Sequence, residues 1–256
     1  MGRCIAGSPQ LVRRPREVSV DTTRTKWIAG GVLVTGAAGV VDHKLPRGKL
    51  RNWGATRREI ERCFPGDNLV PDASYVSTRA VTIEAPRSAV WPWLAQMGYR
   101  RGGLYSYDWL DRLFGYLDRP SAESVLPEFQ FVKAGDWIPM GRGPNWPVRI
   151  AEPERAFVLE PVQDRITWSF YLLPHSESAT RLVTRVRCAP PVSLAERITM
   201  PFVNAAAFVM TRRMLLGIKR RAEALERARE AEEDAPARDE EEAVELLAGD
   251  VLTPVG

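Results

Sequence analysis

Two hydrophobic periods follow one another early in the central part of the chain. Between Thr78 and Glu84 apolar and polar residues alternate, with Val81 and Ile83 on one side, which is typical of a half-buried strand. The segment from Pro86 to Gly98 has a helical period instead. Pro86 can begin this helix, because proline is tolerated at the first helical position. Its apolar stripe follows at steps of four and three: Val90, Leu94 and Met97. A strand followed directly by a helix is therefore predicted, and a second short helix is expected over Ser106–Phe114.

The next part of the chain contains short segments rich in aromatic and β-branched residues, separated by Gly, Pro, Asp or Ser. Six strands are predicted: Phe129–Val132, Asp136–Met140, Pro147–Ala151, Ala156–Glu160, Arg165–Leu173 and Thr180–Cys188. Their spacing indicates an antiparallel meander. The clearest alternation puts four apolar side chains on one face: Ile166, Trp168, Phe170 and Leu172.

The last of these strands has one apolar face and one charged face. Arg181, Arg185 and Arg187 share the charged face. We expect this face to be solvated. With the register reversed, the three arginines would line an interior and would select a carboxylate or phosphate head group.

A long amphipathic helix is predicted from Pro190-Pro191 to about Glu232. Its apolar side carries Phe208, Leu215, Ile218, Ala222 and Leu225. The helix is expected to cover the apolar face of the sheet, since neither element can bury its hydrophobic side alone. The fold class predicted is α+β, a helix-grip arrangement in which a curved antiparallel sheet wraps around a long C-terminal helix and encloses a cavity.

Several segments resemble START-like proteins of the SRPBCC superfamily, which includes polyketide cyclases/dehydratases and lipid-transfer proteins. The resemblance to an actinobacterial-type branch rests on these segments: Trp53–Thr56, Pro65–Asp67, Ile83–Gly98, Gly102–Trp109, Gly135-Asp136, Thr167–Phe170, Thr180–Arg187 and Met210–Lys219. It covers about Trp53 to Glu226. The resemblance implies a pocket for an apolar ligand and leaves the type of reaction open.

The N-terminal part of the chain divides into a basic arm and an apolar segment. Residues 1–26 form the arm, and residues 27–41 are uncharged. Fifteen helical residues reach only about 22 Å, short of a hydrocarbon core of about 30 Å. Three interpretations stay open for this segment: a membrane anchor, a buried or surface-lying helix, and a secretory signal. Membrane association through this segment is the expected localisation, with a cytoplasmic protein as the alternative.

The C-terminal part is acidic. From Glu230 onward ten acidic residues stand against one base, Arg238. Residues 232–256 are predicted to be a disordered acidic tail, which leaves 52–231 as the START-like domain. Over the whole chain of 256 residues the net charge is only +4, with 45% hydrophobic and 27% charged residues. These proportions exclude collagen-like, wholly disordered and polytopic membrane classes, and we expect no nucleic-acid partner.

No nucleophile elbow, Walker A loop, dinucleotide fingerprint or HExxH motif occurs. His43 and His175 are the only histidines, so a paired-histidine metal site is not expected. No metal and no cofactor are predicted.

The candidate site residues fall into two groups. Aromatic and charged residues near two glycines are expected at the cavity mouth, where they either contact a ligand or cover the core; those that could direct proton transfer are Arg101, Tyr105, Tyr107 and Asp108. Predicted ligand-binding residues are Tyr105, Tyr107, Trp109, Trp168, Phe170, Met210 and Met214. Residues like the last four more often belong to the plain core than to a pocket lining. Asp136 is expected to be a turn residue. Trp91 and Trp93 are expected to point in different directions, with one of them exposed or filling a neighbouring gap.

Three functions remain open. The favoured one is binding of a hydrophobic small molecule, lipid or polyketide-like, without chemistry. The second is a polyketide cyclase/aromatase-like enzyme without a cofactor, and the third is a protein-interaction or stress-response module. The oligomeric state is not predicted.

Overall fold

The computed structural model describes residues 50–250, with no account of the side chains of residues 202 and 235–250. The basic arm, the apolar segment 27–41 and the last six residues lie outside the described residues. No helix within the described part is long and apolar enough to cross a membrane.

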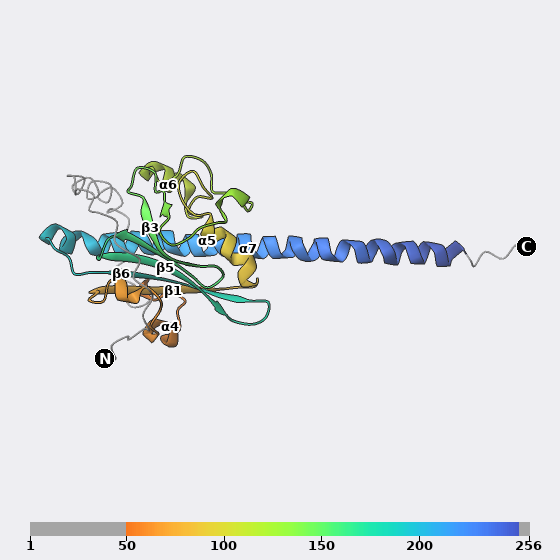
Figure 1. The fold of residues 1–256 in the computed structure, drawn as a ribbon, viewed down its shortest axis with the longest axis horizontal. Helices are drawn as coiled ribbons and strands as arrows, with labels where there is room; N and C mark the ends of the chain where they lie inside the picture. The colour runs from red at the N-terminus through yellow and green to blue at the C-terminus, as the bar shows by residue number, and fades with distance from the viewer. Residues whose placement is uncertain (1–49, 251–256) are drawn as a thin grey trace, which may run out of the picture.

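A six-stranded antiparallel sheet forms the centre of the molecule (Figure 1). Its strands are β1 (Tyr75–Ile83), β2 (Trp137–Ile138), β3 (Trp146–Glu152), β4 (Ala156–Val162), β5 (Ile166–Pro174) and β6 (Thr180–Cys188). The spatial order is β1-β6-β5-β4-β3-β2, which makes β1 an edge strand paired with the last strand of the chain. Five of the six predicted strands within residues 129–188 agree with β2 to β6 to within about two residues at each end.

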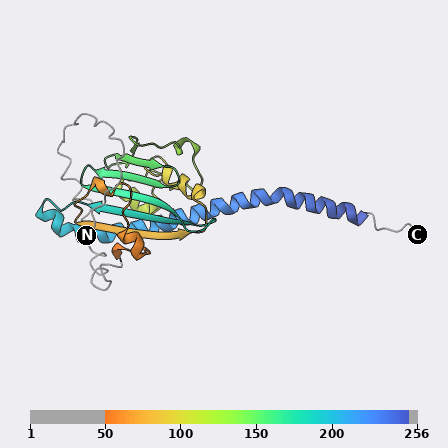
Figure 2. The ribbon, with the colours of Figure 1, turned by 60° about the horizontal axis from the view of Figure 1, so that its bottom comes forward.

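The helices are α4 (Arg57–Glu61), α5 (Arg87–Ala95), α6 (Asp108–Phe114) and α7 (Leu194–Asp250), with single 3-10 turns η3 (Asp67–Leu69) and η4 (Pro127–Phe129). Figures 1 and 2 show α7 running along one face of the sheet and projecting well beyond it. This arrangement confirms the helix-grip fold. The helix continues to Asp250 instead of ending near Glu232; the division of the chain into domain and tail stays a prediction.

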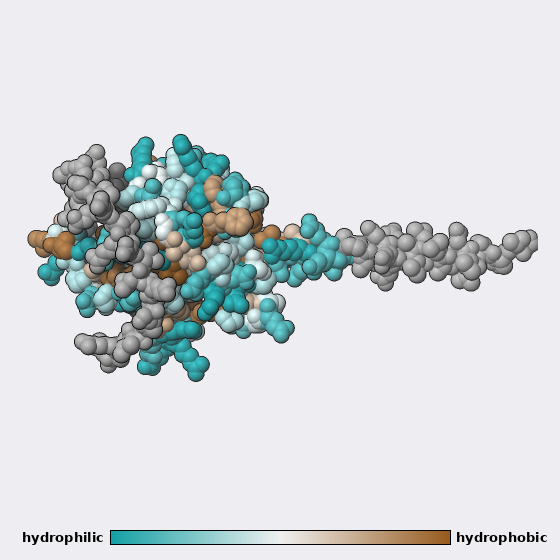
Figure 3. Space-filling view, viewed as in Figure 1, coloured by the Kyte–Doolittle hydropathy of each residue, from teal (hydrophilic) through white to brown (hydrophobic). Residues whose placement is uncertain are grey.

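The main core lies on the face of the sheet that meets α5 and α7, which we call the inner face. Phe157, Phe170 and Leu182 from the strands pack there against Met214 and Ile218 of α7. Burying apolar side chains in this way is the main source of stability for such a domain. At its start α7 carries exposed apolar side chains, Leu194 and Ile198 among them, seen as a brown patch in Figure 3.

One expectation about local structure is wrong. Residues 129–132 form no strand: Pro127 begins the 3-10 turn η4, and Phe131 is 95% exposed with no neighbouring strand to pair with. Trp91 and Trp93 point toward different partners, as expected for residues two apart on a helix, and both are buried. The helix α5 is covered on two sides, so that Trp91 meets Phe157 beneath the sheet and Trp93 meets Tyr105 of the following loop.

The opposite face of the sheet, the outer face, is covered by residues 52–71, which we call the outer cover. A complete capping box starts α4, with Thr56 and Glu59 each accepting a hydrogen bond from the other's backbone N–H. The ring of Phe64 then stacks on Tyr171 of β5 at 4.2 Å between centroids. The Tyr171 hydroxyl donates to the Pro65 carbonyl at 2.6 Å.

The three arginines of β6 point into this cover, so the charged face predicted to be solvated is buried. Arg185 is nearly inaccessible and donates to the Asp67 carboxylate at 2.7 Å. Arg181 holds Glu59 with two nitrogens, and Arg187 donates to the Val70 carbonyl. The register of β6 is the expected one. The acidic partners, Glu59 and Asp67, come from a segment more than a hundred residues earlier in the chain.

Candidate functional site

The predicted site residues of the segment 101–109 line two separate hollows. Tyr105, Tyr107, Asp108 and Trp109 lie together beside α7, in a hollow of about 310 Å³. We call it the mouth pocket; its remaining walls come from Ser106, Glu123, Arg213, Leu216, Gly217, Arg220 and Arg221. Arg101 lies in the other hollow, of about 290 Å³.

The base of the mouth pocket is Tyr105, held in a backbone conformation that is rare for its type. Its φ is +57°, and its ring lies under the Arg221 guanidinium at 4.9 Å. Gly217 allows α7 to lie close to the Tyr105 backbone, because a Cβ at position 217 would clash with the Tyr105 carbonyl oxygen. Burial raises the pKa of the Tyr105 phenol, and the Gln96 side chain and nearby arginines oppose the rise only partly. Tyr105 is therefore neutral, and it forms part of the floor of the mouth pocket.

The rim of the mouth pocket is aromatic and accessible. Tyr107 is half-buried and precedes α6, while Trp109 is 66% exposed. The guanidinium of Arg213 lies 5.8 Å from the centre of the Tyr107 ring. Leu216 adds an apolar side chain from α7. The pocket thus combines flat apolar surfaces with a cation, the composition expected where an organic molecule is held by contact and oriented by a few polar groups.

Hydrogen bonds fix the loops that form the pocket. The Asp108 carboxylate accepts from the Ser121 backbone N–H and hydroxyl at 3.0 and 2.7 Å. Glu123 accepts from Arg220 and Arg221 of α7 at 2.9 and 2.6 Å. Asp108 therefore already has two donors, so that its observed role is to fasten the loop to residue 121.

Behind the rim lies a buried carboxyl group that the sequence analysis did not single out. Asp111 of α6 is inaccessible to solvent and accepts from the Ser106 hydroxyl through Oδ2. Among the described residues its Oδ1 has no hydrogen-bond partner. Burial, together with the neighbouring charge of Asp108, raises the pKa of Asp111 to about 6, although the Ser106 hydroxyl lowers it. Its position in the sequence, one turn after Asp108, gives no sign of this burial.

Arg101 binds the C-terminal end of α5 through hydrogen bonds and lies outside the mouth pocket. It donates to the Met97 and Ala95 carbonyls at 3.0 and 2.8 Å, which satisfies groups that a helix end leaves free. Its guanidinium also lies over the Phe129 ring at 4.5 Å and donates to the Phe129 carbonyl. Burial lowers the pKa of Arg101, and Asp136 opposes this.

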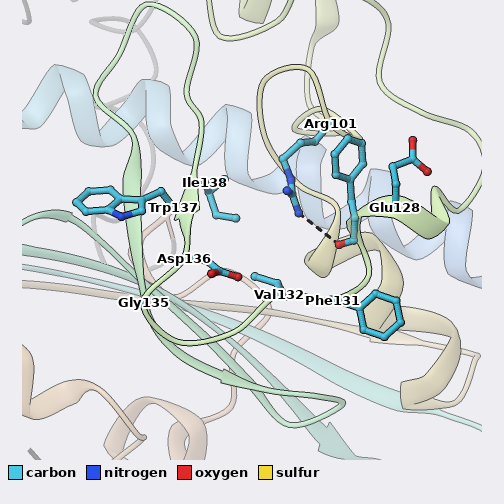
Figure 4. Close-up of a pocket in the computed structure, with 9 residues that line it drawn as sticks. Arg101, Glu128, Phe131, Val132, Gly135, Asp136, Trp137 and Ile138 are labelled. Atoms are coloured by element: carbon cyan, nitrogen blue, oxygen red, sulfur yellow. Dashed lines mark hydrogen bonds between the residues drawn. The ribbon is translucent and has the colours of Figure 1, made fainter. Parts of the chain in front are cut away.

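Asp136 and Trp137 complete the Arg101 hollow. The Asp136 carboxylate accepts from the Lys133 backbone N–H at 2.9 Å, which is the turn role expected for it. Trp137 is 59% exposed at the other side of the hollow (Figure 4).

The four ligand-binding residues predicted beneath α7 differ in burial. Phe170 and Met214 are fully buried members of the main core. Trp168 and Met210 are half-buried, and the Trp168 indole N–H donates to the Thr184 hydroxyl at 3.0 Å. These residues do not line the mouth pocket.

Among the residues that the structure describes, no group of three or more His, Cys, Asp or Glu side chains is placed to hold a metal ion. No protein-family model matches the chain, and no curated protein matches it.

Solved structures do match, with low sequence identity. The Zhui aromatase/cyclase from Streptomyces sp. R1128 shares 15% identity over 58% of this chain and 93% of its own, with a TM-score of 0.34. The Polyketide_cyc-like protein Cgl2372 from Corynebacterium glutamicum shares 16% identity over 62% of this chain and 94% of its own, with a TM-score of 0.30. CalU16 from Micromonospora echinospora shares 14% identity over 58% of this chain and 84% of its own, with a TM-score of 0.29.

Proposed function

We propose that the domain binds a hydrophobic small molecule, lipid or polyketide-like, at the mouth pocket. The observation that supports this most directly is the accessible Trp109, which stands with Tyr107 and Leu216 around a hollow of about 310 Å³. Exposing a large aromatic side chain to water is unfavourable, and burying it against an apolar partner is favourable. The proposed ligand lies against these side chains, with Arg213 at its polar end.

The test compares two equally prominent tryptophans. A fluorescent fatty acid is titrated into the full chain and into Trp109→Ala, with Trp137→Ala as the matched control because Trp137 is similarly exposed in the other hollow. We expect Trp109→Ala to weaken binding about tenfold, since it removes one large aromatic contact, and Trp137→Ala to bind as the wild type does. Equal affinity of Trp109→Ala and the wild type would refute the mouth pocket as the site.

Membrane association through residues 27–41 is a separate proposal. It is supported by the uncharged composition of that segment. Fractionation of the full chain and of a chain lacking residues 1–41 tests it, because only the full chain should then sediment with membranes.

A further inference from the structure

One positive charge of the mouth pocket has no counterion within the described part of the chain. Three arginines of α7 line the pocket: Arg213, Arg220 and Arg221. Arg220 and Arg221 both donate to the Glu123 carboxylate, at 2.9 and 2.6 Å. Arg213 is exposed, and it makes no hydrogen bond or ion pair with any described residue. Of the three guanidinium groups, that of Arg213 is therefore the one available to a ligand.

The acidic side chains of the same pocket are already engaged. Glu123 is held by two arginines, and Asp108 accepts from the backbone N–H and the hydroxyl of Ser121. The lining thus contains three cationic and two anionic side chains, and both anionic ones have donors. A cationic ligand would have to displace one of these donors, whereas an anionic ligand meets a guanidinium that is free.

The free guanidinium stands next to an apolar surface. Leu216 follows Arg213 by three residues, which makes the two side chains neighbours on one face of the helix. Arg220 is seven residues from Arg213, or about 10 Å along the helix, and Leu216 and Gly217 lie between them. The Tyr107 ring flanks the Arg213 guanidinium at 5.8 Å. A head group bound by Arg213 would therefore have apolar side chains directly beside it for the rest of the molecule.

We propose that the mouth pocket selects an amphipathic molecule with an anionic head group, a carboxylate or a phosphate, and that Arg213 binds this group. A planar guanidinium can donate two parallel hydrogen bonds to either anion. An ion pair in open water contributes little, but here the apolar part of the ligand excludes water from one side of the pair. The site lies between α7 and the segment 105–123, and no strand residue lines it. This inference rests on the proposed function and adds the class of ligand.

The experiment measures the binding of decanoate, decyl phosphate and 1-decanol to the full chain by calorimetry, at constant ionic strength. We expect at least one of the two anions to bind about fivefold more tightly than the alcohol. Arg213→Met keeps an apolar side chain without the charge and should abolish this preference. Arg213→Lys keeps the charge without the planar pair of donors and should retain part of it. Whichever anion binds more tightly identifies the head group.

Arg227→Met is the matched control. Arg227 is also an exposed arginine of α7 that has no ion pair among the described residues, but it lies outside the mouth pocket. Its replacement should leave the preference for the anion unchanged. Three results would overturn the proposal: equal affinity for the anions and the alcohol, a preference that survives in Arg213→Met, or a preference lost equally in Arg227→Met.

Trp109→Ala separates this inference from the proposed function. If the mouth pocket is the site, this variant weakens the binding of all three ligands and leaves the ratio of their affinities unchanged. If all three bind Trp109→Ala as tightly as the wild type, the proposed function fails and this inference fails with it. If Trp109→Ala weakens all three while Arg213→Met retains the preference, this inference alone fails.

Discussion

On the outer face of the sheet, each buried arginine meets acceptors that fit it, whereas on the inner side several buried polar groups have no counterpart. Arg185 donates to Asp67, to Thr78 and to three carbonyls of the outer cover. On the inner side, Trp93 Nε1 and Asp111 Oδ1 have no hydrogen-bond partner among the described residues. Buried polar groups are normally satisfied, and exceptions gather at sites that do something besides hold the fold. The outer face is therefore built for stability, and the inner side is where binding is to be sought.

The largest expected effect is the loss of a matched arginine. Arg185→Met should lower the free energy of unfolding by about 3–5 kcal/mol, because it leaves the Asp67 carboxylate and several carbonyls of the outer cover without their donor. Urea unfolding followed by circular dichroism measures this.

Arg187→Met is the matched control, since Arg187 is less buried and lies 3.9 Å from Asp67. It should cost less than half as much. If Arg185→Met were as stable as the wild type, the two faces would not differ in the way described.

A smaller effect, with a pH signature, is expected at Asp111. Its folded pKa of about 6 exceeds the ordinary value of 3.8, so the folded state binds the proton more tightly and stability falls as pH rises from about 4 to about 6. Asp111→Asn, which stays neutral, should be more stable than the wild type by about 1–3 kcal/mol at pH 8 and should show no gain at pH 4. Urea midpoints at both pH values test this, and an equal difference at the two would contradict it.

An acidic residue of the outer cover should behave in the opposite sense. Although burial opposes it, hydrogen bonds from Arg181 and from the Thr56 backbone hold the pKa of Glu59 below its ordinary value. A lowered folded pKa means that this stabilisation is present above about pH 4.5 and is lost as the pH falls through the folded pKa. The two regions of the molecule thus respond to acid with opposite signs.

The strands with strict alternation could be predicted from the sequence, because one apolar face against one polar face determines which side is buried. Thr180–Cys188 is found with its predicted bounds. The strand predicted at residues 129–132 is absent, because the hydrophobic residues that follow Pro127 form an exposed turn. The partners of the β6 arginines could not be inferred, because Glu59 and Asp67 come from a distant segment placed by tertiary packing.

Of the candidate site, the clustering of Tyr105, Tyr107, Asp108 and Trp109 agrees with the sequence, since they follow one another on a single loop. The α7 residues that complete the pocket were not predicted together with it. Their contribution depends on Gly217, whose missing side chain lets the helix approach the loop, and pattern analysis treats such a residue as a neutral position in a helix.

The length of α7 has a consequence for local opening. A helix of 57 residues spans about 85 Å; its core contacts extend to Leu225, and residues 227–234 are exposed. A helical stretch without a packed face is only marginally stable. In hydrogen exchange, amides between residues 214 and 222 should therefore be the slowest of the helix, and those beyond residue 230 should exchange through fraying. Although α7 is one continuous helix, its packed part is thus expected to open much less readily than the part that projects beyond the core.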